Sequence, residues 1–396
     1  MTRAEVRSTP ASAPVPHALG FSMPAEWEPH RATWIAWPHK RGDWPGKFGA
    51  IPWVFVEMVR QLSRGEQVGM LVRSKAEQRS AARMLEQSGT SLDKLEFVKL
   101  PTDRSWTRDS LPLFVTRPRA RRRRAQTRKV DREVAAVKWR FNGWARYRDH
   151  QLDDAAGLEL PARLRHVCWT PQAEFRGIQR RVVLEGGGVD VDGQGTLLTS
   201  ESCLLSGPQA RNRALGRAGL EGLFSDYLGA ERVLWVGEGI VGDDTAGHVD
   251  DFVRFVAPGT VVLCQQRRRT DPNHRRLELA RETLEHVRDA KGRRLELVRL
   301  PMPEPLVYRG ERLPASYANF YIGNEAVLVP TFNDGADRAA LGILAELFKD
   351  RRVVGIHAVD LVVGLGTLHC STQQEPAGVP AKPTDLQRPT SRPFAP

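Results

Sequence analysis

The chain has 396 residues, 41% of them hydrophobic, and carries a formal net charge of +12 at pH 7. That is enough apolar content to fill a real core, so we expect a globular protein. No apolar run approaches the 18 residues of a membrane span, and residues 1–15 lack the apolar segment of a secretory signal, which predicts a cytoplasmic protein without membrane contact. Four widely spaced cysteines, none in a CxxC pair, indicate neither a disulfide framework nor a zinc site.

The excess positive charge is concentrated in one segment. Eight basic residues lie within 117–129, and the formal charge without them falls from +12 to +4. No aromatic residue is interleaved there for bases to stack on, so we interpret the segment as a solvated basic insertion. It predicts weak contact with polyanions and argues against specific nucleic-acid binding, because a basic run alone gives only sequence-independent attraction to phosphate.

Helical and strand patterns alternate along the chain between two ends rich in Pro. Residues 1–16 and 377–396 are expected to be disordered tails. Helices are predicted at 51–62, at 74–87 after a Ser-Lys-Ala-Glu capping box, from 271 onward, and at 337–348. Strands are predicted at 95–100, 233–236, 261–264, 295–300, 326–329 and 353–356. No low-complexity linker divides this α/β pattern, so we expect a single domain over 17–376.

A cysteine late in the chain is the first candidate for chemistry. Cys370 follows Gly364-Leu-Gly-Thr-Leu-His, and His248 and Glu185 lie far upstream. A thiol with a remote imidazole and carboxylate is typical of nucleophilic catalysis. Taken alone, Cys370 fits an inert buried thiol better, because free cysteine is among the most buried residue types.

Two further residues could bind a planar cation. Trp106 precedes Asp109 by three residues, and Pro112 favours a loop or strand end there over a helix interior. The carboxylate would accept paired hydrogen bonds from a guanidinium while the indole packs on its plane. The alternative is a surface ion pair of Arg108 with Asp109 beside a core tryptophan.

Glu185 precedes three glycines, and His248 lies two residues before Asp250. Glu185 could orient His248, although a β-hairpin turn between 182–184 and 189–191 is an alternative. On an extended segment His248 and Asp250 would face the same side. A metal site using His248, Asp250 and the acids Asp243, Asp244 and Asp251 is the weaker interpretation, since no HExxH-like spacing is present.

The spacing of these motifs indicates a structural repeat. Asp109 to Glu185 is 76 residues, Glu185 to His248 is 63, and His248 to Cys370 is 122, or twice 61. A structural repeat of 60 to 75 residues would place one functional loop per module at a common centre.

Several acids around a thiol oppose thiolate formation unless a cation neutralises them. A guanidinium substrate supplies that cation, so the set suits an arginine-like substrate better than a peptide carbonyl. Two alternatives stay open: a cysteine peptidase, and a polyanion-binding protein without catalysis.

The motifs together resemble the agmatine deiminase family, which also contains bacterial peptidyl-arginine deiminases. The resemblance runs from Met23-Pro-Ala-Glu-Trp-Glu-Pro-His30 and Thr33-Trp-Ile-Ala-Trp-Pro38, through Trp106-Thr-Arg-Asp109, Phe141-Asn-Gly-Trp144, Glu185-Gly-Gly-Gly188 and Gly247-His-Val-Asp250, to Leu368-His-Cys-Ser-Thr-Gln-Gln-Glu-Pro376. It implies the pentein fold, in which five ββαβ modules surround a central site.

The resemblance also implies roles. Cys370 would attack the guanidinium carbon to give a covalent thiouronium, and His248 would act as acid and then base, oriented by Glu185. Asp109 and Asp250 would clamp the guanidinium, Trp106 would wall the channel, and no metal or organic cofactor would be needed. Agmatine would yield N-carbamoylputrescine and ammonia, toward putrescine; peptidyl-arginine or another guanidino compound is the alternative substrate. Family members often form dimers or larger assemblies, so a homo-oligomer is possible.

The chain departs from the family pattern in three places: Leu365 replaces a common glycine, Ser110-Leu-Pro112 replaces Thr-Gly-Pro, and the basic insertion follows. We expect Leu111 and Leu365 to add bulk beside the pocket.

Overall fold

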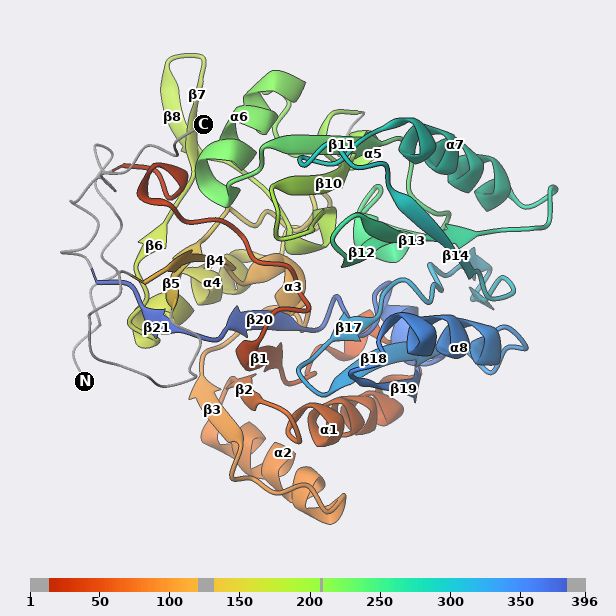
Figure 1. Cartoon of the computed structure of the whole chain (residues 1–396). Coiled ribbons are helices and arrows are strands. Elements are labelled where there is room, and N and C mark those ends of the chain that lie inside the picture. The colour runs from red at the N-terminus through yellow and green to blue at the C-terminus, as the bar shows by residue number, and fades with distance from the viewer. Residues whose placement is uncertain (1–13, 120–131, 207–208, 383–396) are drawn as a thin grey trace.

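The structure is a computed structural model that describes residues 14–119, 132–206 and 209–382. Its core is one motif used five times: two antiparallel strands, a helical connection, and a third strand that pairs parallel to the second. Figure 1 shows these small sheets grouped around the middle of the molecule, with α1, α2, α6, α7 and α8 outside them. The five ββαβ modules that the resemblance implied are therefore present.

Four modules follow one another along the chain. Their bounds are β4 (Leu113–Pro118), β5 (Arg132–Val137), α4 (Gln151–Arg163) and β6 (Cys168–Trp169); β9 (Val189–Val191), β10 (Thr196–Ser200), α5 (Glu201–Leu204), α6 (Arg217–Leu228) and β11 (Arg232–Val236); β12 (Val253–Ala257), β13 (Thr260–Gln265), α7 (Pro272–His286) and β14 (Glu296–Pro301); β17 (Tyr321–Ile322), β18 (Ala326–Thr331), α8 (Asp337–Leu347) and β19 (Arg352–His357).

The fifth module closes the ring by joining the two ends of the domain. Its first strand is β20 (Gln373–Pro376), which pairs antiparallel with β1 (His30–Ala36) through Thr33 opposite Gln374 and Trp34 opposite Gln373. β1 then pairs parallel with β2 (Gln67–Val72) after α1 (Ile51–Leu62), and α2 (Lys75–Gln87) leads to β3 (Leu95–Lys99) at the edge. This pairing brings Cys370, three residues before β20, to the centre.

Smaller elements decorate this ring. They are α3 (Thr107–Ser110), the hairpin of β7 (Gln172–Phe175) and β8 (Ile178–Arg181), the pair β15 (Val307–Tyr308) and β16 (Glu311–Arg312), and β21 (Val379–Pro380), which extends the sheet of β5. None of the helices in the described parts of the chain is long and apolar enough to cross a membrane.

Predicted elements agree with the structure where local chemistry specifies them. The capping serine Ser74 accepts a hydrogen bond from the Glu77 amide at 3.1 Å, as a capping box requires. The Glu77 carboxylate reaches the amide of Arg73, one residue earlier than the motif predicts. The Asp271 carboxylate caps α7 by accepting from the Asn273 amide at 2.9 Å. The predicted strands are all present, with ends shifted by one or two residues.

Three local predictions were wrong. The segment before Pro112 is a single helical turn, α3, which ends at Ser110 because Leu111, the residue before the proline, has extended backbone. Gly186–Gly188 is a 3-10 turn, and β9 pairs with β10, so no hairpin joins 182–184 to 189–191. Val249–Asp251 is also a 3-10 turn and not an extended segment.

The predicted boundaries also shift. Residues 377–382 belong to the fold, since β21 pairs with β5 and Ala381 is buried. Arg117 and Pro118 form the end of β4, so the basic insertion begins later than predicted; residues 120–131 lie outside the described chain, as do the outer parts of both predicted tails.

Candidate active site

Each of the five modules sends the loop before its first strand to the same central place. The side chains brought together there are those of Asp109 before β4, Glu185 before β9, His248 and Asp250 before β12, Asn319 before β17, and Cys370 before β20. The predicted repeat, with one loop per module at a common centre, is thus observed.

Gly187 marks where three of these loops meet. A methyl group added at this glycine would lie 2.6 Å from His248 Nδ1, 2.9 Å from Asp109 Oδ1 and 3.0 Å from Asp250 Oδ2. Its own amide donates to Asp109 Oδ1 at 2.9 Å. Only glycine leaves room for these three groups, which explains the Glu-Gly-Gly-Gly run better than a hairpin does.

Cys370 is 8% exposed and lines a pocket. Asn319 Nδ2 donates to its Sγ at 3.1 Å, and the thiol lies 3.7 Å from Asp250 Oδ2. Burial, and then the charges of Asp250, Asp251 and Asp109, raise the pKa of Cys370 well above its usual value. Without a cation in the pocket, the thiol therefore stays protonated at neutral pH.

His248 lies between two carboxylates and is almost fully buried. Its Nδ1 is 3.7 Å from Asp109 Oδ1 and its Nε2 is 3.6 Å from Glu185 Oε2. Burial alone would lower the pKa of His248, but Asp109, Cys203 and Glu185 together raise it well above its usual value. The imidazole is therefore held as a cation that can give up a proton.

Glu185 has a stronger partner than His248. Both of its oxygens accept from Arg211 Nε, at 2.8 and 2.9 Å, and both side chains are fully buried. The remaining guanidinium nitrogens of Arg211 donate to the carbonyls of Gln209 and Thr245. In spite of burial, Arg211 and His248 hold the pKa of Glu185 below its usual value, so it stays ionised beside the imidazole.

The two aspartates differ in their surroundings. Trp144 Nε1 donates to Asp109 Oδ2 at 2.8 Å, and burial raises the pKa of Asp109. Asp250 Oδ2 is 2.6 Å from His369 Nδ1, whose contact lowers the pKa of Asp250 although burial opposes it. Asp250 Oδ1 is buried and has no hydrogen-bond partner among the described residues. That oxygen is free to accept from a ligand.

The pocket that reaches Cys370 has a volume of about 350 Å³. Trp106 and Leu365 form part of its wall, while Arg104, Tyr147 and Asp244 lie in the same lining. Trp106 can pack there because Gly364 and Gly366 have no side chains: a methyl group added at either glycine would come within 2.9 Å of the indole ring. Leu365 lines the pocket as expected, but Leu111 does not: it packs in a separate apolar cluster with Trp34 and other buried residues.

Comparison with known proteins agrees with this arrangement. Residues 22–376 match the model of the Porphyromonas-type peptidyl-arginine deiminase family. The chain belongs to this family.

It is 34% identical to the agmatine deiminase of Ectopseudomonas mendocina (strain ymp) over 91% of this chain and 97% of that one. The Pseudomonas aeruginosa (strain LESB58) agmatine deiminase is also 34% identical, over 93% and 99%. Among solved structures, the Enterococcus faecalis agmatine deiminase superposes with a TM-score of 0.81 at 30% identity, covering 94% of this chain and 100% of that chain. The ring of five modules is therefore the pentein fold.

Sequence reasoning missed several residues of the site. Asn319 is one, and its position carried a signal: it lies 71 residues after His248 and 51 before Cys370, inside the interval of 122 that was twice the repeat. Arg211 and His369 carried none, because their partners lie far away along the chain: Glu185 is 26 residues from Arg211 and Asp250 is 119 residues from His369. The surface pair of Arg108 with Asp109 does not exist; Arg108 is buried and pairs with Glu26 at 3.1 Å.

Two groups of described residues could hold a metal ion, and neither is the set expected from sequence. They are Glu185 with Cys203 and His248, and Asp250 with Asp251 and Cys370. In the first group an ion would have to displace Arg211 from both oxygens of Glu185. The carboxylate of Asp243 accepts from the backbone amides of Thr245, Gly247 and His248, so it is engaged in shaping the loop.

Proposed function

We propose that this protein is an agmatine deiminase that hydrolyses the guanidinium group of agmatine to a ureido group, releasing N-carbamoylputrescine and ammonia. The single observation that carries the proposal is the convergence of a buried thiol, an imidazolium and two carboxylates at the centre of the family fold, next to a pocket that Cys370 and Asp109 line. The family match and the similarity to agmatine deiminases support the choice of reaction.

The substrate's charge starts the reaction. A guanidinium that enters the pocket pairs with Asp109, which lines it, and with the unpartnered Oδ1 of Asp250, whose other oxygen lies 3.7 Å from Cys370 Sγ. This places the positive charge beside Cys370. The cation offsets the negative charges that keep the thiol protonated, so the pKa of Cys370 falls when substrate binds. The thiolate is thus generated in the complex, which restricts its reactivity to cationic ligands.

The chemistry then proceeds in two halves. Cys370 Sγ adds to the central guanidinium carbon, and the protonated His248 gives a proton to the departing nitrogen, which leaves as ammonia. The covalent thiouronium that remains is attacked by water, from which the now neutral His248 removes a proton. Expulsion of the thiolate releases the ureido product. Glu185, held by Arg211, stabilises the charged form of His248 at both stages.

The pocket offers a carboxylate that suits an ammonium group at the other end of the substrate. Asp244 lies in the lining and accepts from the Tyr147 hydroxyl at 2.7 Å. The two cations of the lining are already paired, Arg104 with Asp43 and Asp149 and Lys40 with Asp149. Burial raises the pKa of Asp244 to about 6, so it is ionised at neutral pH and a bound ammonium would keep it so. These observations favour an amine over a carboxylate at the distal end.

The decisive experiment measures ammonia and ureido product from agmatine, free arginine and an arginine peptide, with Cys370→Ser as the control. We expect Cys370-dependent turnover of agmatine, with a kcat/KM at least tenfold above the values for free arginine and the arginine peptide. A tenfold ratio corresponds to ~1.4 kcal/mol, which we ascribe to the contact of the substrate ammonium with Asp244. Preference for the peptide would favour a peptidyl-arginine deiminase, and no turnover of any guanidine would refute the proposal. We also infer that the protein acts in the cytoplasm, where a small intracellular amine is available.

A further inference from the structure

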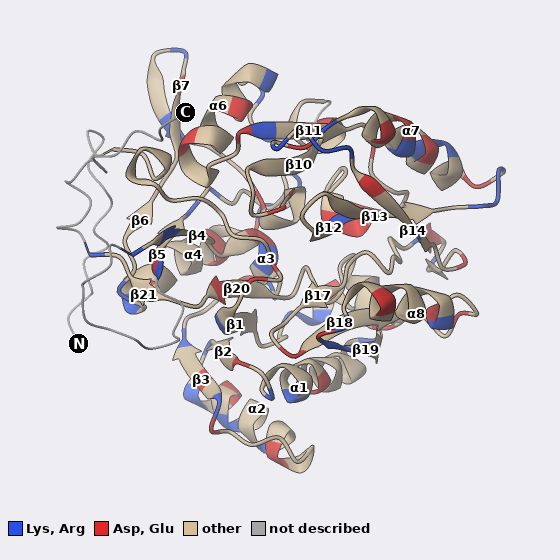
Figure 2. Cartoon of the chain, viewed as in Figure 1, with Lys and Arg blue, Asp and Glu red and all other residues tan. Residues whose placement is uncertain are grey.

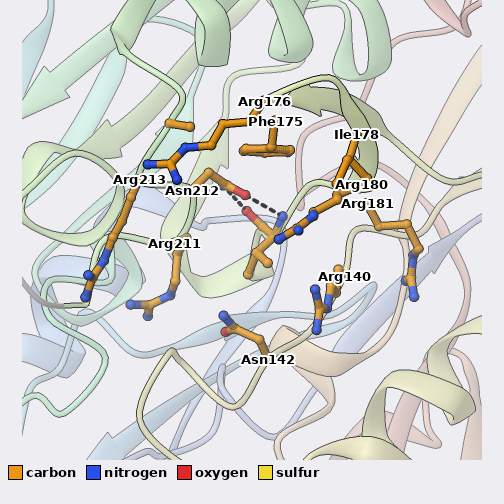
Figure 3. A pocket seen from close by; sticks show the side chains of 12 residues that line it. Arg140, Asn142, Phe175, Arg176, Ile178, Arg180, Arg181, Arg211, Asn212 and Arg213 are labelled. Carbon is orange, nitrogen blue, oxygen red and sulfur yellow. Dashed lines mark hydrogen bonds between the residues drawn. The ribbon is translucent and has the colours of Figure 1, made fainter.

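A second cavity of about 420 Å³ shares no lining residue with the active-site pocket. Its twelve lining residues include six arginines and no Asp or Glu. Figure 3 shows the arginine side chains arranged around Asn212, whose amide is fixed by hydrogen bonds to the backbone of Val183. We call this cavity the arginine pocket; its arginines are Arg140, Arg176, Arg180, Arg181, Arg211 and Arg213.

Two of these arginines are already neutralised. Arg211 is committed to Glu185, and Arg181 pairs with Asp154 at 2.7 Å. By contrast, the side chains of Arg140, Arg176 and Arg180 make no ion pair or hydrogen bond with any residue in the described chain. Like charges gathered without counter-charges repel one another, so an anion that enters the pocket relieves a repulsion built into the folded protein.

One face of the β7–β8 hairpin supplies three of the residues that line the pocket, Phe175, Ile178 and Arg180. Its register sets Phe175 opposite Ile178 and Ala173 opposite Arg180, and these alternate residues share that face. The acid of the hairpin, Glu174, pairs with Gln179 on the other face. Ile178 is 55% exposed. Arg181 lines the pocket from the face that also carries Glu174, but Glu174 itself is not a lining residue. The pocket wall is therefore cationic and apolar.

The tip of this hairpin holds Arg176 in a left-handed backbone conformation that a long side chain disfavours. Arg176 adopts φ +53° and Gly177 φ +78°, as the two central residues of a tight hairpin turn do. Asn or Gly favours that left-handed position, and a long side chain there is strained. Figure 2 shows the positive charge at this tip.

We propose that the arginine pocket binds a small oligophosphate, a molecule with at least two adjacent phosphate groups. Guanidinium groups bind phosphate oxygens through paired hydrogen bonds, and three unpaired arginines, two from the β7–β8 hairpin and Arg140 from outside it, need several anionic oxygens at once. The cavity is within the size range of small-molecule sites. Phe175 and Ile178 offer an apolar wall for an uncharged part, such as a nucleobase.

The test is calorimetric titration of the full-length protein at near-physiological salt with inorganic tripolyphosphate. Arg176→Gly removes a charge and relieves the left-handed strain, so its thermal stability is retained while binding is lost. We expect the Kd to rise about tenfold for Arg176→Gly and for Arg140→Gln. A matched control, Arg121→Gln with Arg122→Gln, removes two charges from the basic insertion and should change the Kd less than twofold.

A second arm separates the sources of the phosphate. A nucleoside triphosphate that binds more tightly than tripolyphosphate identifies a nucleotide as the ligand, and weaker binding identifies the inorganic chain. The proposal is overturned if tripolyphosphate gives no saturable binding, if the control variant loses as much affinity as Arg176→Gly, or if citrate binds as tightly as tripolyphosphate. Because binding is measured without turnover, its failure is independent of the deiminase assay.

Discussion

The glycine run after Glu185 provides a sharp test of the site geometry, because two neighbouring glycines differ in the space around them. In Gly187→Ala the new methyl group would lie 2.6 Å from His248 Nδ1 and 2.9 Å from Asp109 Oδ1. Ordinary contact begins near 3.4 Å, so the imidazole must retreat by about 0.8 Å and the carboxylate by about 0.5 Å. A displacement of about 1 Å at reacting groups costs on the order of 10²-fold in rate.

Gly188→Ala is the matched control. Its methyl group would meet nothing closer than 3.6 Å, the distance to a carbon of the His248 ring. We therefore expect kcat/KM for agmatine to fall at least 10²-fold in Gly187→Ala and less than about fivefold in Gly188→Ala. Overpacking should also cost Gly187→Ala roughly 1–3 kcal/mol of stability, which thermal melting measures.

The assay couples ammonia release to steady-state kinetics, with circular dichroism to confirm that both variants are folded. Equal activity in the two variants would refute the reasoning, because it would show that His248, Asp109 and Asp250 do not need their observed positions. A folded but inactive Gly188→Ala would likewise contradict it.

Three further predictions concern individual side chains. Arg211→Met leaves Glu185 buried and unpaired and should lower the free energy of unfolding by about 3–5 kcal/mol in urea titrations. Because the native pKa of Glu185 is depressed, the difference in unfolding free energy between wild type and variant should shrink as the pH falls through that pKa. A difference that does not change with pH would contradict this prediction. Alkylation of Cys370 by iodoacetamide, followed by mass spectrometry, should be slow at pH 7 and rise into the alkaline range, and Asp250→Asn should shift the curve to lower pH; a rate that is already maximal at pH 7 would show a thiolate in the free protein. Leu365 adopts φ +67° in the pocket wall, so Leu365→Gly should relieve about 1 kcal/mol of backbone strain and widen the cavity. We expect kcat/KM for an arginine peptide to rise relative to kcat/KM for agmatine. An unchanged ratio of the two kcat/KM values would exclude Leu365 as a specificity residue.

Local chemistry in the sequence was sufficient to predict much of the scaffold. Ser74 and Asp271 begin helices by capping exposed amides, and apolar periodicity sets the faces of α1 and α7. These features depend on neighbours within a few residues. The motifs around Asp109, Glu185, His248 and Cys370 were likewise visible, because each is a short run of unusual composition.

Only the tertiary structure decided which distant groups meet. Arg211 neutralises Glu185, Asn319 contacts the thiol, and the β7–β8 hairpin brings Arg176 and Arg180 to the arginine pocket. None of these contacts leaves a local pattern, since each joins segments from different modules or loops. The same reason explains the wrong prediction for Leu111, whose burial depends on α4 packing from elsewhere in the chain. Spacing and composition indicate that a site exists; the pairing of the modules sets its charges, its pKa values and its free volume.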